Sequence, residues 1–177
     1  TSQFFANVYL NELDQFAKRG LKIKHYFRYV DDLVILSQNK EELEFWRDEI
    51  DKFLQNKLKL ELHPKKQILQ ALSRGVDFVG FVVKPDYTLS RRRIVRSLKE
   101  KLWNLNNHQG EFTEEKANKT LSMVNSYYGQ FKHSNTFGLR RKLWLKNFGK
   151  LLNFLEPVDK NISHFNISNK SEANLET

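Results

Sequence analysis

Residues 24–36 have the sequence KHYFRYVDDLVIL, in which Asp31 and Asp32 stand between two strongly apolar segments. The segments 22–29 and 33–37 are rich in aromatic and β-branched residues, which favour strands. Aspartate is common in tight turns because its short side chain tolerates unusual backbone dihedral angles. The stretch therefore predicts an antiparallel hairpin whose tight turn is formed by Asp31 and Asp32.

The two aspartates also suggest a chemical role. Mg²⁺ prefers carboxylate oxygens together with substrate phosphates, and two such ions stabilise both the attacking and the leaving oxygen of a phosphoryl transfer. On spacing alone, catalysis and simple turn formation stay equally open for Asp31 and Asp32.

The rest of the chain predicts an α+β fold, with a mixed first half and a helical second half. Asn39 and Glu42 form a capping-box pattern that predicts the start of a helix. Alternating apolar positions predict further strands, and the spacing of apolar residues predicts helices. The expected helices are 1–19, the segment after Asn39, 91–107, 114–131 and 137–155, and the expected further strands are 58–62 and 76–83.

Composition points to a folded protein with a polyanionic partner. The net charge is +9, and residues 91–150 hold 14 lysines and arginines against 4 acidic residues, whereas residues 1–90 hold 14 against 13. A concentrated basic segment is typical of a surface that contacts a phosphate backbone. A solvated basic face, or a docking surface for an acidic protein, is the alternative. There is no cysteine, and the apolar stretches are too short to span a bilayer.

Four motifs together resemble a reverse transcriptase. Residues 29–32, YVDD, resemble the Tyr-x-Asp-Asp signature of that family, and three neighbouring motifs agree with it in order and spacing. They are TSQFFAN (1–7), similar to the end of a glycine-led loop and its helix; LELHPKK (60–66), similar to the strand-to-lysine motif; and FVGF (78–81), similar to the primer-grip hairpin.

Three further segments are similar to the bacterial and phage reverse transcriptases of diversity-generating retroelements: Ser2-Gln3, GVDF (75–78) and NSYYGQFKH (125–133). Group II intron maturases and retron enzymes are the nearest competitors. The resemblance implies error-prone copying of a template-repeat RNA into cDNA, with a small accessory protein as partner, in a bacterial or phage-encoded cytoplasmic protein without a membrane association.

The resemblance also implies roles for individual residues. Asp31 and Asp32 are the expected metal ligands and catalytic carboxylates for Mg²⁺, with Mn²⁺ as a substitute. Lys66, or Lys65, is the expected proton donor to the leaving pyrophosphate, unless it is only a solvent-facing charge. The other expected contacts are Ser2, Gln3 and Tyr29 with the template or nucleotide, Phe78, Gly80 and Phe81 with the primer, and Arg91, Arg92, Arg93, Arg96, Arg140, Arg141 and Lys142 with the nucleic-acid backbone.

One part of the family pattern is missing. Reverse transcriptases carry a further aspartate on an earlier palm strand, and neither Asp14 nor Asp77 matches that motif. Since the chain begins at Thr1 rather than methionine, we expect it to be processed or a fragment. We expect a partial palm over 1–90, a basic three-helix thumb over 91–156 and a flexible tail over 157–177.

The expected function is that of an RNA-directed DNA polymerase acting on an RNA template, a DNA or RNA primer and deoxynucleoside triphosphates, with the chain inactive by itself. The alternative is a non-catalytic, maturase-like module that binds nucleic acid. The aromatic residues Trp103, Tyr127, Tyr128 and Trp144 are expected either in the helical core or stacked on bases.

Overall fold

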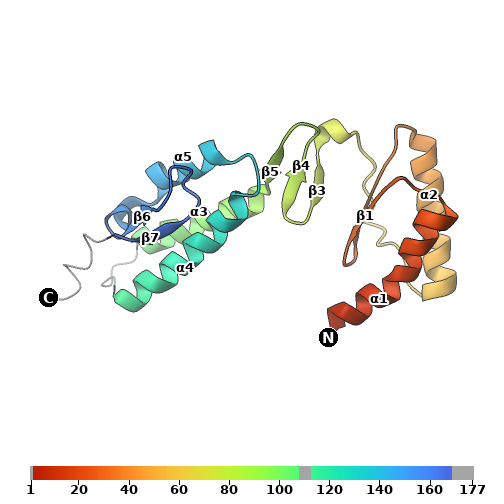
Figure 1. Cartoon of the computed structure of the whole chain (residues 1–177), viewed down its shortest axis with the longest axis horizontal. Coiled ribbons are helices and arrows are strands. Elements are labelled where there is room, and N and C mark those ends of the chain that lie inside the picture. The colour runs from red at the N-terminus through yellow and green to blue at the C-terminus, as the bar shows by residue number, and fades with distance from the viewer. Residues whose placement is uncertain (1, 108–112, 169–177) are drawn as a thin grey trace. The chain divides into compact units, whose positions relative to one another are not determined.

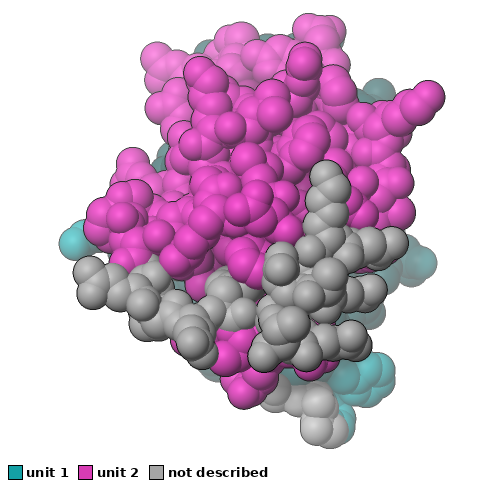
Figure 2. All heavy atoms as spheres, turned by 90° about the vertical axis from the view of Figure 1, so that its left-hand side faces the viewer, with its two compact units in different colours: residues 1–70 teal, residues 71–177 magenta. Residues whose placement is uncertain are grey.

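The protein is described by a computed structural model that covers residues 2–107 and 113–168. It combines helices with small antiparallel sheets, so the predicted α+β class is confirmed (Figure 1). The chain divides into two compact units, Thr1–Gln70 and Ala71–Thr177 (Figure 2). The expected division into a palm up to residue 90 and a thumb beyond it concerns polymerase subdomains rather than compact units, and it stays a prediction.

The first unit is a hairpin packed on two helices. Its elements are α1 (Ser2–Gln15), a π-helical turn (Phe16–Gly20), β1 (His25–Tyr29), β2 (Asp32–Leu36), α2 (Lys40–Phe53) and a second π-helical turn (Leu54–Leu58). Asn39 begins α2 as predicted, because its side-chain oxygen accepts a hydrogen bond from the backbone N–H of Glu41 at 2.9 Å.

The core of this unit explains why the hairpin stays on the helices. Side chains from the two helices, the π-helical turns that follow them, and β1 with the segment before it bury one another: Leu13, Ala17, Ile23, Tyr26, Ile50, Leu54 and Leu58. Each fully buried aliphatic or aromatic side chain contributes about 1.5–3 kcal/mol relative to an exposed one. The hairpin is therefore attached through one face, the face that carries Tyr26.

Two expectations for this unit need correction. Residues 58–62 do not form a strand: Leu58 ends a π-helical turn, Lys59 has a left-handed φ of 52°, and the segment that follows is irregular. Burial of Leu58 in the core overrides the alternating pattern, and the N–H of Leu62 bonds to Asp51 at 3.0 Å instead of to a strand. The hairpin turn is formed by Val30 and Asp31, and Asp32 already belongs to β2.

The second unit begins with a three-stranded sheet and continues as three helices closed by a hairpin. Its elements are a 3₁₀ turn (Leu72–Arg74), β3 (Val76–Phe78), β4 (Phe81–Val83), β5 (Thr88–Ser90), α3 (Arg92–Asn107), α4 (Glu114–Phe131), α5 (Phe137–Asn147), a 3₁₀ turn (Gly149–Asn153), β6 (Leu155–Pro157) and β7 (Phe165–Ile167). The three helices are those predicted, except that the last ends at Asn147 instead of continuing to residue 155. Residues 76–83, expected as one strand, form two strands joined by a turn.

The flexible tail expected from residue 157 is wrong for residues 157–168. Phe165 in β7 and Ile162 before it are buried in the helical core with Tyr128, Phe131 and Phe148. Asn125 fixes β7 to α4, because its amide donates to the carbonyl of Phe165 at 2.9 Å and accepts from its N–H at 2.8 Å. The apolar residues that make the attachment, Ile162, Phe165 and Ile167, are too few and too irregularly spaced to form a periodic pattern that would have predicted it. Residues 169–177 lie outside the described part of the chain.

No helix within residues 2–107 and 113–168 is long and apolar enough to cross a lipid bilayer.

Candidate functional site

The tip of the β1–β2 hairpin presents two adjacent carboxylates. Tyr29 pairs with Asp32 across the hairpin, and Val30 and Asp31 form the two-residue turn. Val30 has a φ of 56°, which is a rare left-handed conformation for a β-branched residue. Asp31 and Asp32 are both exposed, and within the described residues neither carboxylate takes part in a hydrogen bond or an ion pair. Their oxygens are therefore free to bind a cation or solvent.

A partly buried ion pair lies next to this turn. The Arg28 guanidinium forms two hydrogen bonds with the carboxylate of Asp14 in α1, at 2.8 and 2.6 Å, and a third with the carbonyl of Val30, at 2.7 Å. The hydroxyl of Tyr26 also donates to Asp14, at 2.8 Å. Sequence reasoning considered Asp14 only as an unsuitable substitute for the missing aspartate. Tyr26 and Arg28 are two residues apart and so lie on one face of β1, but this spacing does not reveal which residue of α1 they contact.

The ion pair shifts the pKa values of its members. Burial works to raise the pKa of Asp14, but hydrogen bonds from Arg28 and Tyr26 together hold it below its usual value. The hydrogen bond to Asp14 raises the pKa of Arg28. Burial, and then the hydrogen bond to Asp14, raises the pKa of Tyr26. At neutral pH the pair is therefore charged, and Tyr26 remains a hydrogen-bond donor.

The two carboxylates of the hairpin are candidate metal ligands. Exposed carboxylates that have no partner among the described residues match the oxygen ligands that Mg²⁺ prefers. The described residues contain no group of three or more histidine or acidic side chains placed to hold a metal ion. Asp31 and Asp32 thus fit one side of a Mg²⁺ site, and the other ligands have to come from substrate, water or further protein groups.

Of the other residues expected near the reaction, Gln3, Tyr29 and Lys66 lie on exposed surface. Lys66 is in an exposed turn over 63–66, where its N–H bonds to the carbonyl of His63 at 3.0 Å, and among the described residues its side chain pairs with neither aspartate. Ser2 begins α1, and Gln3 is exposed in its first turn. Tyr29 is exposed beside Asp32. Their expected roles stay predictions.

The residues expected to contact the primer form the β3–β4 hairpin. Phe78 pairs with Phe81, and Val79 and Gly80 form the turn with φ values of 48° and 86°. Gly80 is required by its left-handed backbone. A Cβ at this position would also lie 2.8 Å from the side-chain nitrogen of Gln130 in α4. The glycine therefore allows this turn to approach the helices of its own unit, and contact with a primer stays a prediction.

The basic residues of α3 lie along two grooves. Arg92, Arg96 and Lys99 line a groove with β5 and the start of α5, which contributes Leu139. Arg93 and Lys101 line a second groove that faces α4. Arg91, just before the helix, forms an ion pair with Asp77 instead of pointing freely into solvent. The basic surface therefore consists of two cationic stripes along one helix.

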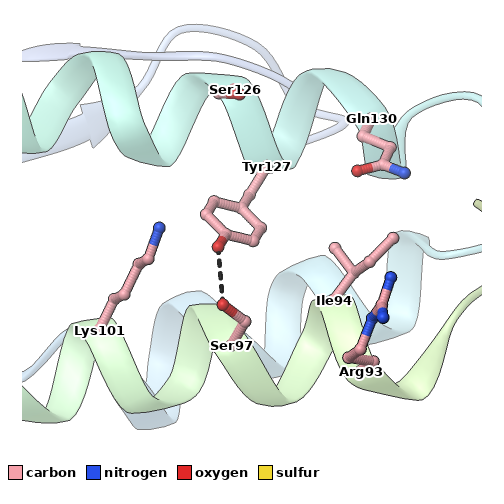
Figure 3. A pocket seen from close by; sticks show the side chains of 7 residues that line it. All are labelled: Arg93, Ile94, Ser97, Lys101, Ser126, Tyr127 and Gln130. Atoms are coloured by element: carbon pink, nitrogen blue, oxygen red, sulfur yellow. Dashed lines mark hydrogen bonds between the residues drawn. The ribbon is translucent and has the colours of Figure 1, made fainter.

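Figure 3 shows the groove between α3 and α4. Ser97 and Tyr127 connect the two helices through a hydrogen bond of 2.9 Å between their hydroxyl oxygens, and Arg93 and Lys101 lie on either side of it along α3. The Lys101 ammonium is 5.1 Å from the centroid of the Tyr127 ring, which is within the range of a cation–π interaction. The hydrogen bond with Ser97 lowers the pKa of Tyr127, and Lys101 acts in the same direction. Hydroxyl, amide and cationic groups thus line one open groove.

The basic residues of α5 are divided between surface and core. Arg141 and Lys142 are exposed, but Arg140 is only 7% exposed and donates to the carbonyl of Ile162 at 3.2 Å. The expectation that Arg140 contacts a nucleic-acid backbone is therefore not supported by its position. It shares a helix face with the buried Leu143, three residues on.

The aromatic residues of this unit are similarly divided. Tyr128 is buried and donates its hydroxyl to the carbonyl of Arg140 at 3.0 Å, and Trp144 is partly buried. Trp103 is 66% exposed on α3. Tyr128 is thus a core residue, whereas Trp103 and the groove residue Tyr127 are accessible for stacking.

Comparison with known proteins gives one partial similarity. No protein-family model matches the chain. A segment of 64 residues is 31% identical to the group II intron-encoded protein LtrA of Lactococcus lactis subsp. cremoris, and the same value holds for the protein of strain MG1363. The segment covers 36% of this chain but only 11% of that relative. The similarity is consistent with the predicted resemblance to the reverse transcriptase family, and it leaves the diversity-generating subtype untested.

Proposed function

We propose that the protein containing residues 1–177 is an RNA-directed DNA polymerase that copies an RNA template into cDNA. The observation that carries the proposal is the β1–β2 hairpin, which is packed on the helices of its unit and presents the exposed carboxylates of Asp31 and Asp32, unpaired within the described part of the chain. Partial similarity to an intron-encoded protein adds to it. The basic grooves of α3 are consistent with a nucleic-acid partner.

In this proposal Asp31 and Asp32 hold Mg²⁺, with Mn²⁺ as a substitute. The bound ions would stabilise the charge that develops on the attacking and leaving oxygens of nucleotidyl transfer. Asp31 at the turn is the more direct ligand, and Asp32 in β2 supports it. Lys66 is proposed to donate a proton to the leaving pyrophosphate, since it is an exposed ammonium with no ion-pair partner among the described residues.

The second unit is proposed to hold the template–primer duplex through its phosphates. The contacts are assigned to Arg92, Arg93, Arg96, Arg141 and Lys142, which are exposed. Such contacts fix the position of a duplex without reading its sequence. The turn at Gly80 is proposed to lie against the primer strand, and Gln3 and Tyr29 against the template or the incoming nucleotide. An accessory protein and a diversity-generating subtype remain proposals from the sequence resemblance alone.

The test is primer extension by the whole protein on a poly-ribonucleotide template with Mg²⁺ and deoxynucleotides. We expect extension by the parent and none by Asp31→Ala, because the substitution removes a ligand without removing a core residue. Template binding and the circular-dichroism spectrum of the variant should be unchanged. Extension by Asp31→Ala at a rate near that of the parent would mean that Asp31-Asp32 is only a turn, and the proposal would be abandoned.

A non-catalytic, maturase-like nucleic-acid-binding module is the second candidate. It is favoured by the partial similarity to an intron-encoded protein and by the small number of acidic groups gathered among the described residues. The same assay separates the candidates. A non-catalytic module would bind the template–primer duplex but would not extend the primer. Asp31→Ala would then change neither duplex binding nor extension.

A further inference from the structure

The Arg28 side chain connects helix α1 to the turn that presents Asp31. Its guanidinium uses Nε and Nη2 for the two carboxylate oxygens of Asp14, at 2.8 and 2.6 Å. Nη1 donates to the carbonyl of Val30 at 2.7 Å and to the side-chain oxygen of Asn7 at 3.1 Å. Asn7 and Asp14 are two turns apart in α1 and so lie on one face. The Arg28 guanidinium therefore connects Asn7 and Asp14 of α1 to the turn at Val30.

This contact is well shielded from solvent. The side chain of Arg28 is 10% exposed and that of Asp14 is 23% exposed. A two-point bond between a guanidinium and a carboxylate fixes direction as well as distance, and it is stronger than a bond between neutral groups. Tyr26 adds a bond to the same carboxylate from the neighbouring inward position of β1. Asp14 is thus held from two sides, and it in turn fixes the orientation of Arg28.

The left-handed conformation of Val30 connects its hydrogen bond with Arg28 to the position of Asp31. A left-handed φ is unfavourable for a β-branched residue by roughly 1–2 kcal/mol, so such a conformation persists only where its surroundings enforce it. Among the described residues, the Val30 carbonyl takes its side-chain hydrogen bond from Arg28. Because that carbonyl belongs to the peptide unit joining Val30 to Asp31, its orientation determines where the Asp31 side chain begins.

We propose that Arg28 is a positioning residue for the Asp31 carboxylate, acting through the carbonyl of Val30, and that Asp14 keeps Arg28 in place for this task. The inference rests on the proposed function, since it assigns Arg28 to the same site. It goes beyond that function because it concerns a residue that touches neither substrate nor metal. A purely stabilising ion pair is the alternative, and it predicts lower stability with an unchanged site.

The test is Arg28→Lys in the whole protein, compared with Arg47→Lys. Lysine keeps the charge but cannot bond to Asp14 at two points and to Val30 at the same time. Arg47 also pairs with an aspartate, Asp48, but both side chains are about half exposed. The control therefore changes a similar ion pair at the surface, away from the turn.

We expect three results for Arg28→Lys. The extension rate at saturating primer and nucleotide falls about 10- to 100-fold, the range found when outer-shell partners of metal ligands are removed. Mn²⁺ binding, measured by electron paramagnetic resonance without substrate, weakens by about tenfold. The backbone amides of residues 30–32 exchange hydrogen faster, while the affinity for template–primer is unchanged. Arg47→Lys should match the parent in all of these measurements.

The possible outcomes separate the inference from the proposed function. If Arg28→Lys lowers the melting temperature but leaves Mn²⁺ affinity, amide exchange and extension rate as in the parent, Arg28 is structural and the inference is overturned. If Asp31→Ala extends primers normally, the proposed function itself fails, whatever Arg28 does. Should Arg28→Lys not fold, Asp14→Asn takes its place: it keeps the shape but removes the charge. For Asp14→Asn, smaller decreases in extension rate and Mn²⁺ affinity together with faster exchange of amides 30–32 support the inference. A lower melting temperature alone overturns it.

Discussion

The two units of this protein carry their charges in different ways. The first unit has nearly balanced charge, with 12 basic against 11 acidic residues, and its candidate functional feature is a single turn with two carboxylates. The second has 18 basic against 10 acidic residues, and its candidate phosphate contacts are exposed basic side chains on α3 and α5, such as Arg92, Arg96 and Arg141. A carboxylate site depends on the position of individual atoms, whereas a phosphate-binding surface depends on summed charge.

This difference predicts how the units respond to substitution. One change at the hairpin should remove a function completely, because a metal ligand has no substitute. One change on the basic surface should weaken binding by a fraction, because neighbouring cations act together. The largest effects on activity are therefore expected from substitutions in the first unit. In the second unit, a large effect is expected only for stability, when a core residue is replaced.

The largest expected effect is the loss of polymerase activity in residues 1–177 by themselves. Primer extension by the isolated chain should not exceed a blank, because its described residues place no group of three or more acidic or histidine side chains together, as a two-metal site requires. The same preparation should still bind an RNA–DNA duplex. Fluorescence anisotropy and primer extension, run side by side, check both statements, and circular dichroism confirms that the chain is folded. Extension clearly above the blank contradicts this prediction.

The second effect concerns the hairpin that closes the helical unit. Phe165→Ala should destabilise the unit by about 3–5 kcal/mol, since the ring is fully buried against Tyr128 and Phe148. Phe137→Ala, at a residue 48% exposed, is the matched control and should cost less than about 1 kcal/mol. Urea unfolding measures both. Equal effects would mean that residues 157–168 are not part of the core in solution.

The third effect is the pH dependence of the Asp14–Arg28 pair. The pKa of Asp14 is lowered in the folded state, so the pair stabilises the fold fully above about pH 5 and loses this contribution as pH falls through 3.8 and below. Asp14→Asn should therefore cost about 2 kcal/mol at pH 7 and progressively less toward pH 3. Unfolding free energies of both proteins between pH 3 and pH 7 test this. A constant difference would show that the charge of Asp14 does not contribute.

The smallest effect is expected for duplex binding. Changing Arg91, Arg92 and Arg93 to alanine should flatten the log–log dependence of affinity on salt by about two units instead of three, because Arg91 is paired with Asp77. The loss should be the same for all duplex sequences. A triple change at Lys18, Lys22 and Lys24, in the charge-balanced unit, should do much less. Equal losses for the two triple variants would mean that α3 is not the binding surface, and would favour docking of an acidic protein there.

The sequence predicted local elements well where one pattern dominated. The hairpin around Asp31, the helix that begins after Asn39 and the three helices of the second unit all have strong periodicity or caps, and all are present. The strand expected at 58–62 failed because Leu58 is buried as the end of a helical turn. The alternation of apolar and polar residues over 58–62 does not show which of the apolar side chains is buried in the core.

Long-range contacts were the part that sequence reasoning could not supply. Arg28 and Asp14 are 14 residues apart, and each alone looks like an ordinary charged surface residue. Arg140 was counted among the surface cations, although its position on the inner face of α5 places it beside Leu143. Net charge counts arginines without showing which side of a helix they occupy. The attachment of β7 to α4 likewise includes hydrogen bonds between Asn125 and Phe165, which are 40 residues apart.

The central claim is that the Asp31 carboxylate takes part in RNA-templated DNA synthesis. The most direct test is single-turnover incorporation of one matched deoxynucleotide by the whole protein on a defined RNA template, comparing Asp31→Asn with Asp48→Asn. Both substitutions keep the shape of an exposed aspartate and remove its charge. We predict that Asp48→Asn incorporates at the rate of the parent and that Asp31→Asn is slower by at least about 100-fold. Equal rates for the two variants, or no incorporation by the parent, would contradict the account.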